Sequence, residues 1–449
     1  MNVALVVLDT LRLDAFREEF DWLPGHRFEQ AWSPANWTVP VHGSLFTGRS
    51  PAEIGVHAKH QSLDCPEPTL AELLSEEGYR TRAFSANPNV SPIFGFDRGF
   101  EDFYGSYRLR GMERNVYDWE SFIAEHQSRG PVRYLTAFRE VLSSNVATVP
   151  SLRRGLDIKL RDLGVRSEPD DDGAKRALSL IRSTNFSDDE FFFCNLMEAH
   201  GPYDPPRDYW TTEWDDDRDW TTFPALLATI TGDLPGDATP ERLEQAYSDS
   251  VRYLSDIYRE IFEELRKSFD VVITLGDHGE LFGRHGVYQH AYGLSPELTN
   301  VPLAVSGDGI TDGESLTPVS LTDVFHTITE ITDIHAGDSD RTLVTEDGVS
   351  ASEGRSVYTE YHGVDNRNRQ RVTNAGHDPD PYDEELFGAV DAGDYGYQTM
   401  REFIAPNGRK EELRGLVVEY AESLDRREYE SNHELPTSVK RQLEDLGYA

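Results

Sequence analysis

The chain has 449 residues, which is enough for one large domain with a smaller appendage or for two to three domains. Its formal net charge is −38, from 81 acidic and 43 basic residues, and this balance disfavours a sequence-independent hold on nucleic acid. We therefore exclude a nucleic-acid coat protein and expect no nucleic-acid partner.

The acidic residues are spread through every segment instead of forming one tail. This composition resembles that of halophilic proteins, in which molar salt screens the self-repulsion and the charge maintains solubility. An acidic protein of a low-salt organism is the alternative.

The N-terminus predicts a buried strand rather than a signal peptide, because it has no basic segment, no small-residue cleavage site and an acid at position 9. No apolar run approaches the ~18 residues of a membrane span. Cys65 and Cys194 are far apart in sequence; they could pair, but a reduced cytoplasmic setting is the simpler interpretation.

A continuous apolar run at residues 3–8 and two largely apolar runs at 191–197 and 270–275 predict parallel strands buried on both faces. Each run is followed at once by polar residues. Because the carboxyl ends of parallel strands meet at the same edge of a sheet, we expect the three polar clusters to converge.

Amphipathic helices are predicted between the strands, a short one at residues 69–78 and a long one at 241–269. Alternation of strands and helices indicates an α/β fold, with a mostly parallel sheet flanked by helices on both faces.

Residues 1–340 are expected to form the catalytic α/β domain, with two insertions. Residues 105–175 lack strong strand signals and contain helical fragments such as 132–142, so we interpret them as a cap. Residues 204–240 are rich in Trp, Asp and Thr and are interpreted as an acidic surface insertion near the site.

The pattern of predicted helices and strands changes after about residue 340. We therefore expect residues 341–449 to form a small C-terminal α+β subdomain. Residues 356–361 and 387–397 are typical of short exposed strands, and residues 438–446 of a closing amphipathic helix.

Thr38 begins a stretch that suits a nucleophile, Thr38-Val-Pro40-Val-His42-Gly-Ser-Leu-Phe. The proline fixes one backbone dihedral, and the residues after it suit a helix start that would present the Thr38 hydroxyl from a tight turn. A hydroxyl is a weak nucleophile at neutral pH, so it needs a metal or a base beside it.

Asp277 and His278 follow a predicted strand directly, where the backbone turns and both side chains can converge on one ion. With Asp9 and the Thr38 oxygen they make a mixed oxygen and nitrogen set, suited to Mn²⁺, Mg²⁺, Ca²⁺ or Zn²⁺. Taken alone, Asp-His-Gly-Glu is equally well explained as a turn with a capping aspartate.

Several motifs together resemble the sulfatase branch of the alkaline phosphatase superfamily, over almost the whole chain and in the right order. They are Val-Val-Leu-Asp-Thr-Leu-Arg-Leu-Asp at 6–14, Thr38-x-Pro40-x-His42 with Thr47-Gly48-Arg49, Gly276-Asp277-His278-Gly279-Glu280 with His285-Gly286, and residues 76–84, 94–100 and 300–303.

The resemblance implies an alkaline-phosphatase-like sheet, with Asp9, Asp277 and His278 as metal ligands and Thr38 at the nucleophile position. Sulfatases have at that position a cysteine or serine, which is converted to formylglycine, and an arginine four residues later. Threonine cannot give that aldehyde, and His42 stands in place of the arginine.

A threonyl ester must be attacked by water or by an acceptor alcohol, and relatives with threonine at this position are similar to phosphodiesterases and phosphoglycerol transferases. We therefore favour a phosphate mono- or diester over a sulfate ester. A second metal ion is not expected, because Thr10 follows Asp9 and no aspartate has a histidine four residues later.

The resemblance also brings His200 and His290 to positions that face the anionic group, where either could protonate a leaving oxygen; a hydrogen-bonded loop histidine is the alternative for each. His42 could stabilise the nucleophile or be structural. His57 and His285 are equally compatible with pocket and non-pocket positions.

Three other residues near the motifs have structural interpretations. Arg12 and Asp14 are interpreted as a strand-end ion pair or cap, and Glu280 as a partner of His278.

Three functions remain open on the sequence. The first is a metal-dependent hydrolase or transferase that uses Thr38 on a phosphate or sulfate ester; the second is a sulfatase that works without formylglycine; the third is an inactive module that binds anionic glycans. The expected partner is a small anionic ester, such as a sulfated or phosphorylated glycan or lipid head group.

Overall fold

The computed structural model describes most of the chain. The described residues are 1–109, 171–211, 218–334, 338–345 and 354–429, together with 132–143, isolated positions between 117 and 159, residue 336 and residues 348–349. No helix in these ranges is long and apolar enough to cross a membrane. Cys65 and Cys194 are both free and buried.

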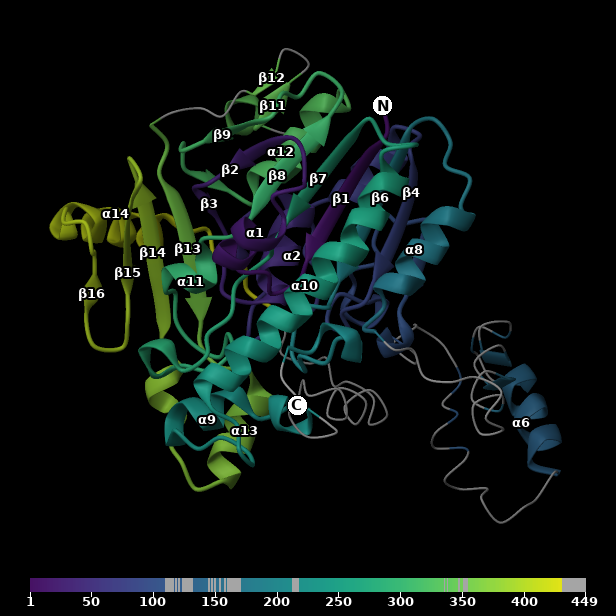
Figure 1. The fold of residues 1–449 in the computed structure, drawn as a ribbon, viewed down its shortest axis with the longest axis horizontal. Helices are drawn as coiled ribbons and strands as arrows, with labels where there is room; N and C mark the ends of the chain where they lie inside the picture. The colour runs from purple at the N-terminus through teal and green to yellow at the C-terminus, as the bar shows by residue number, and fades with distance from the viewer. Residues whose placement is uncertain are drawn as a thin grey trace.

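A large, mostly parallel sheet forms the centre of the molecule (Figure 1). Its strands, in spatial order, are β5 (Asp102–Gly105), β4 (Arg80–Ser85), β6 (Glu190–Leu196), β1 (Val3–Leu8), β7 (Val271–Leu275), β8 (Leu303–Gly307), β2 (His26–Phe28) and β9 (Gly313–Ser315). From β5 to β7 all neighbours run parallel, whereas β8 is antiparallel to both β7 and β2. The three strands predicted from apolar runs are thus adjacent, with β1 in the middle.

Helices cover both faces of this sheet because β1 is apolar on both. Val3, Leu5 and Val7 belong to the core beneath α2 (Thr38–Thr47), α4 (Leu70–Glu76) and α12 (Asp323–Ile331). The alternate residues of β1 belong to the core beneath α1 (Leu13–Glu19), α8 (Ala174–Ser183) and α10 (Pro240–Leu265). Figure 1 shows α8 and α10 crossing one face of the strands.

The two helices predicted from the sequence are confirmed, and their ends follow local chemistry. A capping box between Thr69 and Glu72 begins α4. The side chain of Thr239 caps α10, with Pro240 in the first turn, where its missing N–H costs no hydrogen bond.

A second, antiparallel sheet forms the C-terminal part, with β13 (Val357–His362), β14 (Glu385–Asp391), β15 (Asp394–Gln398) and β16 (Phe403–Ile404) in order. The prediction that these strands are exposed is wrong. The helix α14 (Lys410–Ser423), which the sequence did not suggest, packs on one face through Leu413 and Val417 and covers Phe387 and Ala389 of β14. The alternate residues Leu386 and Val390 are buried on the other face, in a cluster with Trp32 and Leu298.

The remaining elements are short or peripheral. They are α3 (Pro51–Ile54), α6 (Val132–Ser143), α9 (Ala225–Thr231), α11 (Pro296–Thr299), α13 (Asn366–Asn374), the pair β3 (Ala31–Trp32) and β10 (Val319–Ser320), the pair β11 (Val344–Thr345) and β12 (Gly348–Val349), and 3-10 turns at Pro92–Phe94, Tyr107–Leu109, Arg207–Tyr209, Asp219–Thr221, Arg284–Gly286, Ser339–Arg341 and Asp380–Tyr382.

The expected insertions are described only in part. The helical fragment expected at 132–142 is present as α6, but most of residues 105–175 lie outside the described ranges, so the cap remains a prediction. The closing helix expected at 438–446 also lies outside them.

Glu360, on β13, joins the second sheet to the rest of the molecule. Its buried carboxylate accepts hydrogen bonds from the backbone N–H of Ala52, at 3.0 Å, and from the hydroxyl of Tyr420. It also pairs with His362, whose Nε2 lies 2.6 Å away, while Nδ1 of His362 lies 2.9 Å from Glu385.

These contacts predict a pH-dependent stability. Burial alone would lower the pKa of His362, but its hydrogen bonds to Glu360 and Glu385 outweigh burial and raise the pKa from 6.5 to about 9. The stabilisation is therefore complete below pH 6.5 and is lost as the pH rises through 9. Between pH 6 and pH 10 the unfolding free energy of the wild type should fall by roughly 3 kcal/mol more than that of His362→Gln, measured by urea unfolding.

Equal falls in the two proteins would contradict this account. Glu385→Gln, which keeps the buried Glu360 partner, should give an intermediate fall and provides a second test if His362→Gln folds poorly.

Candidate active site

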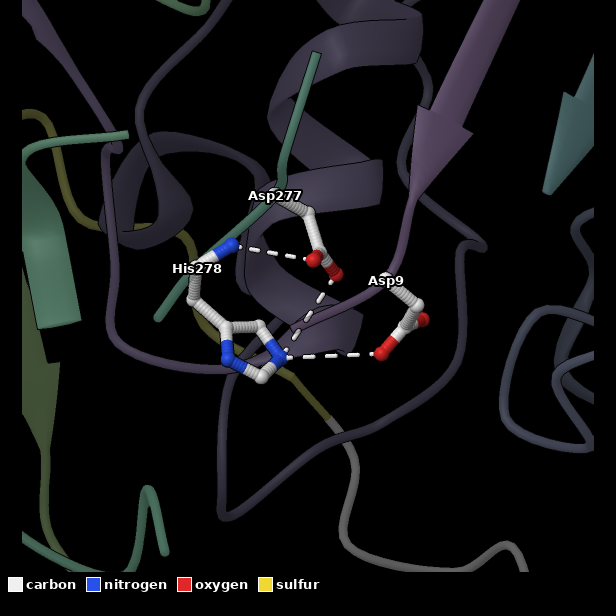
Figure 2. A group of neighbouring side chains, drawn as sticks. All are labelled: Asp9, Asp277 and His278. Atoms are coloured by element: carbon white, nitrogen blue, oxygen red, sulfur yellow. Dashed lines mark hydrogen bonds and ion pairs between the residues drawn. The ribbon is translucent and has the colours of Figure 1, made fainter. Parts of the chain in front are cut away.

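The carboxyl ends of β1 and β7 bring two carboxylates and an imidazole together. Asp9 follows β1 directly, and Asp277 and His278 follow β7. All three side chains are buried, and one ligand atom from each lies within 4.8 Å of the others (Figure 2). Convergence at this edge of the sheet follows from the parallel pairing of β1 with β7.

Only one of the two carboxylate oxygens of Asp277 accepts hydrogen bonds from the described residues. Its Oδ1 accepts hydrogen bonds from the backbone N–H groups of Thr10, at 3.0 Å, and His278, at 2.9 Å. Its Oδ2 is buried and receives no hydrogen bond from any described residue. A buried carboxylate oxygen without a partner is costly unless a cation binds it.

Asp9 is held by three donors. Asn87 and Asn195 donate from their Nδ2 atoms to Oδ2, at 2.7 and 3.1 Å, and the Thr10 hydroxyl donates to Oδ1 at 3.0 Å. The sequence analysis missed both asparagines. Asn195 lies near the end of β6, within a predicted strand, and this position was the available signal. Asn87 comes just after β4, for which no strand was predicted.

Thr10 bridges the two carboxylates, since its N–H contacts one and its hydroxyl the other. Its backbone has a φ of +63°, in the left-handed region that a β-branched residue rarely occupies. The Thr10 carbonyl accepts a hydrogen bond from the buried Tyr247 hydroxyl at 3.0 Å, which helps to hold this strained conformation.

Thr38 is the first residue of α2, as the Pro-containing stretch predicts. Its Oγ1 lies 3.2 Å from Nε2 of His278 and 3.4 Å from Nδ2 of Asn87. The Nδ1 atom of His278 lies 3.0 Å from the Gly279 carbonyl, to which it donates, so the lone pair of Nε2 faces Thr38.

The imidazoles and carboxylates shift each other's pKa values. Burial alone would raise the pKa of Asp9, but His200, His278 and His42 hold it below the ordinary value. Burial, together with the charge of Asp9, raises the pKa of Asp277 well above its usual range. Burial lowers the pKa of His278 well below 6.5, so this ring is neutral at neutral pH and can act as a ligand.

The residues present therefore fit a divalent cation. The site offers a mixed set of ligands: two carboxylates, one unprotonated imidazole nitrogen and one hydroxyl oxygen. A bound cation would also be a partner for Oδ2 of Asp277, which accepts no hydrogen bond from the described residues. A cation bound between Asp9 and Asp277 would also offset the electrostatic repulsion between their carboxylates.

His42 lies one helical turn below Thr38, away from the open side of the site. Its Nδ1 donates to the Thr38 carbonyl at 2.9 Å, and its Nε2 lies 3.4 Å from Nδ2 of Asn195. Burial lowers the pKa of this fully buried ring, which keeps it neutral. These contacts suit a positioning residue rather than a group that touches substrate.

His200 and His290 line a cavity of about 130 Å³ that also reaches Thr38. The centroid of the His290 ring lies 4.4 Å from that of His278 and 5.4 Å from that of His200. Burial lowers the pKa of His200, whose Nδ1 lies 2.6 Å from the Gly201 carbonyl. Both histidines thus line the same cavity as Thr38, and their contact with substrate stays a prediction.

Glu280 is not a partner of His278, so that expectation is wrong. The backbone carbonyl of Gly279 occupies the Nδ1 position instead. The Glu280 carboxylate accepts a hydrogen bond from the Tyr203 hydroxyl at 2.7 Å and lies 3.4 Å from Nδ1 of His290. It therefore lies within ion-pair distance of the histidine in the cavity wall.

Neither His57 nor His285 lines the cavity. His57 stacks on His362, with ring centroids 4.7 Å apart, and His285 lies 3.1 Å from Glu297 on the surface. The expected ion pair between Arg12 and Asp14 is present, with Nε of Arg12 2.8 Å from the carboxylate.

Comparisons with known proteins identify the family to which the chain belongs. A sequence model of the sulfatase family matches residues 10–334. Two curated relatives match: the low-salt glycan biosynthesis sulfotransferase Agl7 of Haloferax volcanii, 32% identical over 18% of this chain, and the choline-sulfatase of Rhizobium meliloti, 24% identical over 69% of it. The matches span only 22% and 60% of those two proteins.

Among solved structures, the phosphonate monoester hydrolase of Silicibacter pomeroyi superposes with a TM-score of 0.59 at 16% identity, over 94% of each chain. This likeness confirms the alkaline-phosphatase-like α/β fold. Since the family model covers well over half of its residues, the chain belongs to the sulfatase family, whose members hydrolyse ester bonds.

Proposed function

We propose that the protein is a metal-dependent hydrolase or transferase that attacks a phosphate or sulfate ester with the Oγ1 atom of Thr38. The observation that carries this proposal is the position of Thr38 at the start of α2, 3.2 Å from Nε2 of His278 and beside the buried pair of aspartates. The hydroxyl opens onto the cavity that His200 and His290 line.

Asp9, Asp277, His278 and Thr38 would hold one divalent cation, with Mn²⁺, Mg²⁺ or Ca²⁺ favoured by the oxygen-rich set and Zn²⁺ also compatible. When bound, such a cation supplies positive charge that favours loss of the Thr38 proton and polarises the ester.

The chain's own residues then account for the bond changes. The Oγ1 atom of Thr38 gives its proton to solvent and forms a bond to phosphorus or sulfur while the bond to the leaving oxygen breaks. The leaving oxygen takes a proton from His200 or His290, and that histidine regains a proton from solvent. Asn87, whose amide lies near both Thr38 and Asp9, orients the nucleophile. Attack by water on the threonyl ester completes hydrolysis.

Transfer to an acceptor alcohol is the second candidate. A threonyl ester cannot collapse to an aldehyde as a formylglycine hydrate does, so an outside nucleophile must release it, and an alcohol can replace water. The match to a glycan biosynthesis sulfotransferase supports this alternative and a sulfated or phosphorylated glycan as substrate. Phosphate esters remain our first choice, because threonine excludes the formylglycine route.

Substrate preference provides the first test. With Mn²⁺ present, the protein should cleave bis-nitrophenyl phosphate much faster than nitrophenyl sulfate, as judged by kcat/KM. The reverse preference would reject the phosphoester assignment, and binding of anionic sugars without turnover of either ester would favour an inactive module.

The nucleophile provides the second test. Thr38→Ala should lower kcat by roughly 10³-fold or more while leaving the circular dichroism spectrum unchanged, because it removes the atom that forms the new bond. A variant that keeps its rate would remove Thr38 from the mechanism.

The metal site provides the third test. At a Mn²⁺ concentration about 100-fold above Kd, the wild type should gain about 2.7 kcal/mol of stability, visible as a higher Tm. Asp277→Asn should lose this gain, yet it should be at least as stable as the wild type in EDTA, because it removes a buried charge that Asp9 repels.

Asp188→Asn, at an exposed site away from the cavity, is the matched control and should respond to Mn²⁺ like the wild type. An equal Mn²⁺ response in Asp277→Asn would place the cation elsewhere.

A further inference from the structure

The turn that follows β1 connects the two aspartates of the site. It spans residues 9–12 and leads directly into α1. Thr10 contacts both carboxylates, because its N–H donates to Asp277 and its hydroxyl donates to Asp9, each at 3.0 Å. The conformation of this one residue therefore affects how the two carboxylates lie relative to each other.

The hydroxyl of Tyr247, on α10, binds this turn at two points. It donates to the Thr10 carbonyl at 3.0 Å and accepts the Arg12 N–H at 2.8 Å. All three residues are buried, so water cannot readily replace a lost hydrogen bond. Thr10 has a φ of +63°, which is unfavourable for a β-branched residue, and the two bonds oppose its relaxation.

The Tyr247 side chain is held in place by packing. It is 2% exposed, and its ring centroid lies 5.1 Å from that of Phe282 and 5.7 Å from that of Tyr203. It belongs to a helix of 26 residues, one side of which packs in the core beneath the sheet. A hydroxyl on a well-packed ring of a long helix can hold the turn in one position.

The turn also lies against the backbone that carries Asp277. A Cβ atom on Gly276 would meet the Leu11 carbonyl oxygen at 2.6 Å, so no side chain fits between the two segments. Because the segments are in contact, a shift of the turn would change the separation of Asp9 from Asp277.

We infer that Thr10 and Tyr247 are positioning residues of the metal site, and that the Tyr247 hydroxyl holds the turn so that Asp9 and Asp277 are placed for one divalent cation. This inference rests on the cation site of the proposed function. Tyr247 is not among the residues that line the cavity in front of Thr38, so its effect passes through the turn. Loss of a residue that orients metal ligands typically weakens metal binding by about 10–100-fold.

The test measures the Kd for Mn²⁺ in the folded protein, by calorimetry at constant pH and ionic strength. Tyr247→Phe should raise Kd by about tenfold or more, because binding must then restore the strained conformation of Thr10. Thr10→Ala, which removes the hydroxyl that contacts Asp9, should also raise Kd. Thr10→Ser keeps that hydroxyl and should retain most of the wild-type affinity.

The double variant tests whether the two residues act together. If Tyr247 acts through Thr10, Tyr247→Phe should raise Kd by a smaller factor in the Thr10→Ala background than in the wild type. Equal factors in the two backgrounds would reject this route. If Tyr247→Phe does not fold, the Thr10 variants decide, since equal Kd values for the wild type, Thr10→Ala and Thr10→Ser would overturn the inference.

Tyr258→Phe is the matched control. It removes a buried, hydrogen-bonded hydroxyl from the same helix, but one that contacts Thr274 of β7 instead of the turn. Like Tyr247→Phe, it should lower the unfolding free energy measured by urea in EDTA, yet it should keep the wild-type Kd. An equal rise of Kd in this control would show that general destabilisation weakens the site, against a positioning role.

The proposed function is judged separately. If the wild type cleaves bis-nitrophenyl phosphate and binds Mn²⁺ in a way that depends on Asp277, an unchanged Kd in Tyr247→Phe rejects the positioning role and keeps the function. A wild type that binds no Mn²⁺ would overturn the metal site and this inference together.

Discussion

The structure depends on two carboxylates buried side by side at the ends of adjacent strands. Asp9 and Asp277 are both fully buried, and neither has an arginine or lysine as a partner among the described residues. Two such charges in a dry environment cost several kcal/mol unless donors or a cation offset them. The surroundings supply the donors, from two strand-end asparagines and from backbone N–H groups, and leave one oxygen to a cation.

The central strands of the sheet and the convergence of Asp9, Asp277 and His278 could be predicted, because both depend on local sequence patterns. A strand buried on both faces must be apolar throughout, so residues 3–8 stand out, and the first polar residue after such a run must lie at the sheet edge. Asp9, Asp277 and His278 were found this way. The position of Thr38 followed from the proline two residues later and its effect on the backbone.

The other site residues could not be predicted, since their roles arise only from strand order. Asn87 and Asn195 contact Asp9 because β4, β6 and β1 are consecutive in the sheet, and asparagine after a strand is otherwise an ordinary turn residue. The role expected for Glu280 was wrong because a backbone carbonyl one residue away already satisfies His278. The burial of one face of β14 likewise depended on α14, whose pattern was missed.

The residues around the cavity come from two separate parts of the fold, and this separation affects how such enzymes can evolve. The proposed reacting groups lie on α2, at strand ends and in the loops that follow them, whereas the cavity lining also includes Arg367 and Arg371 of α13, next to a separate antiparallel sheet. That sheet packs against the rest of the molecule through an apolar cluster, in which the ring centroids of Tyr395 and Trp32 lie 4.3 Å apart, and through polar contacts such as the one between Glu360 and Ala52. Mutation or exchange of the later segment can thus give new substrate ranges during evolution while the ancestral bond-breaking apparatus stays intact.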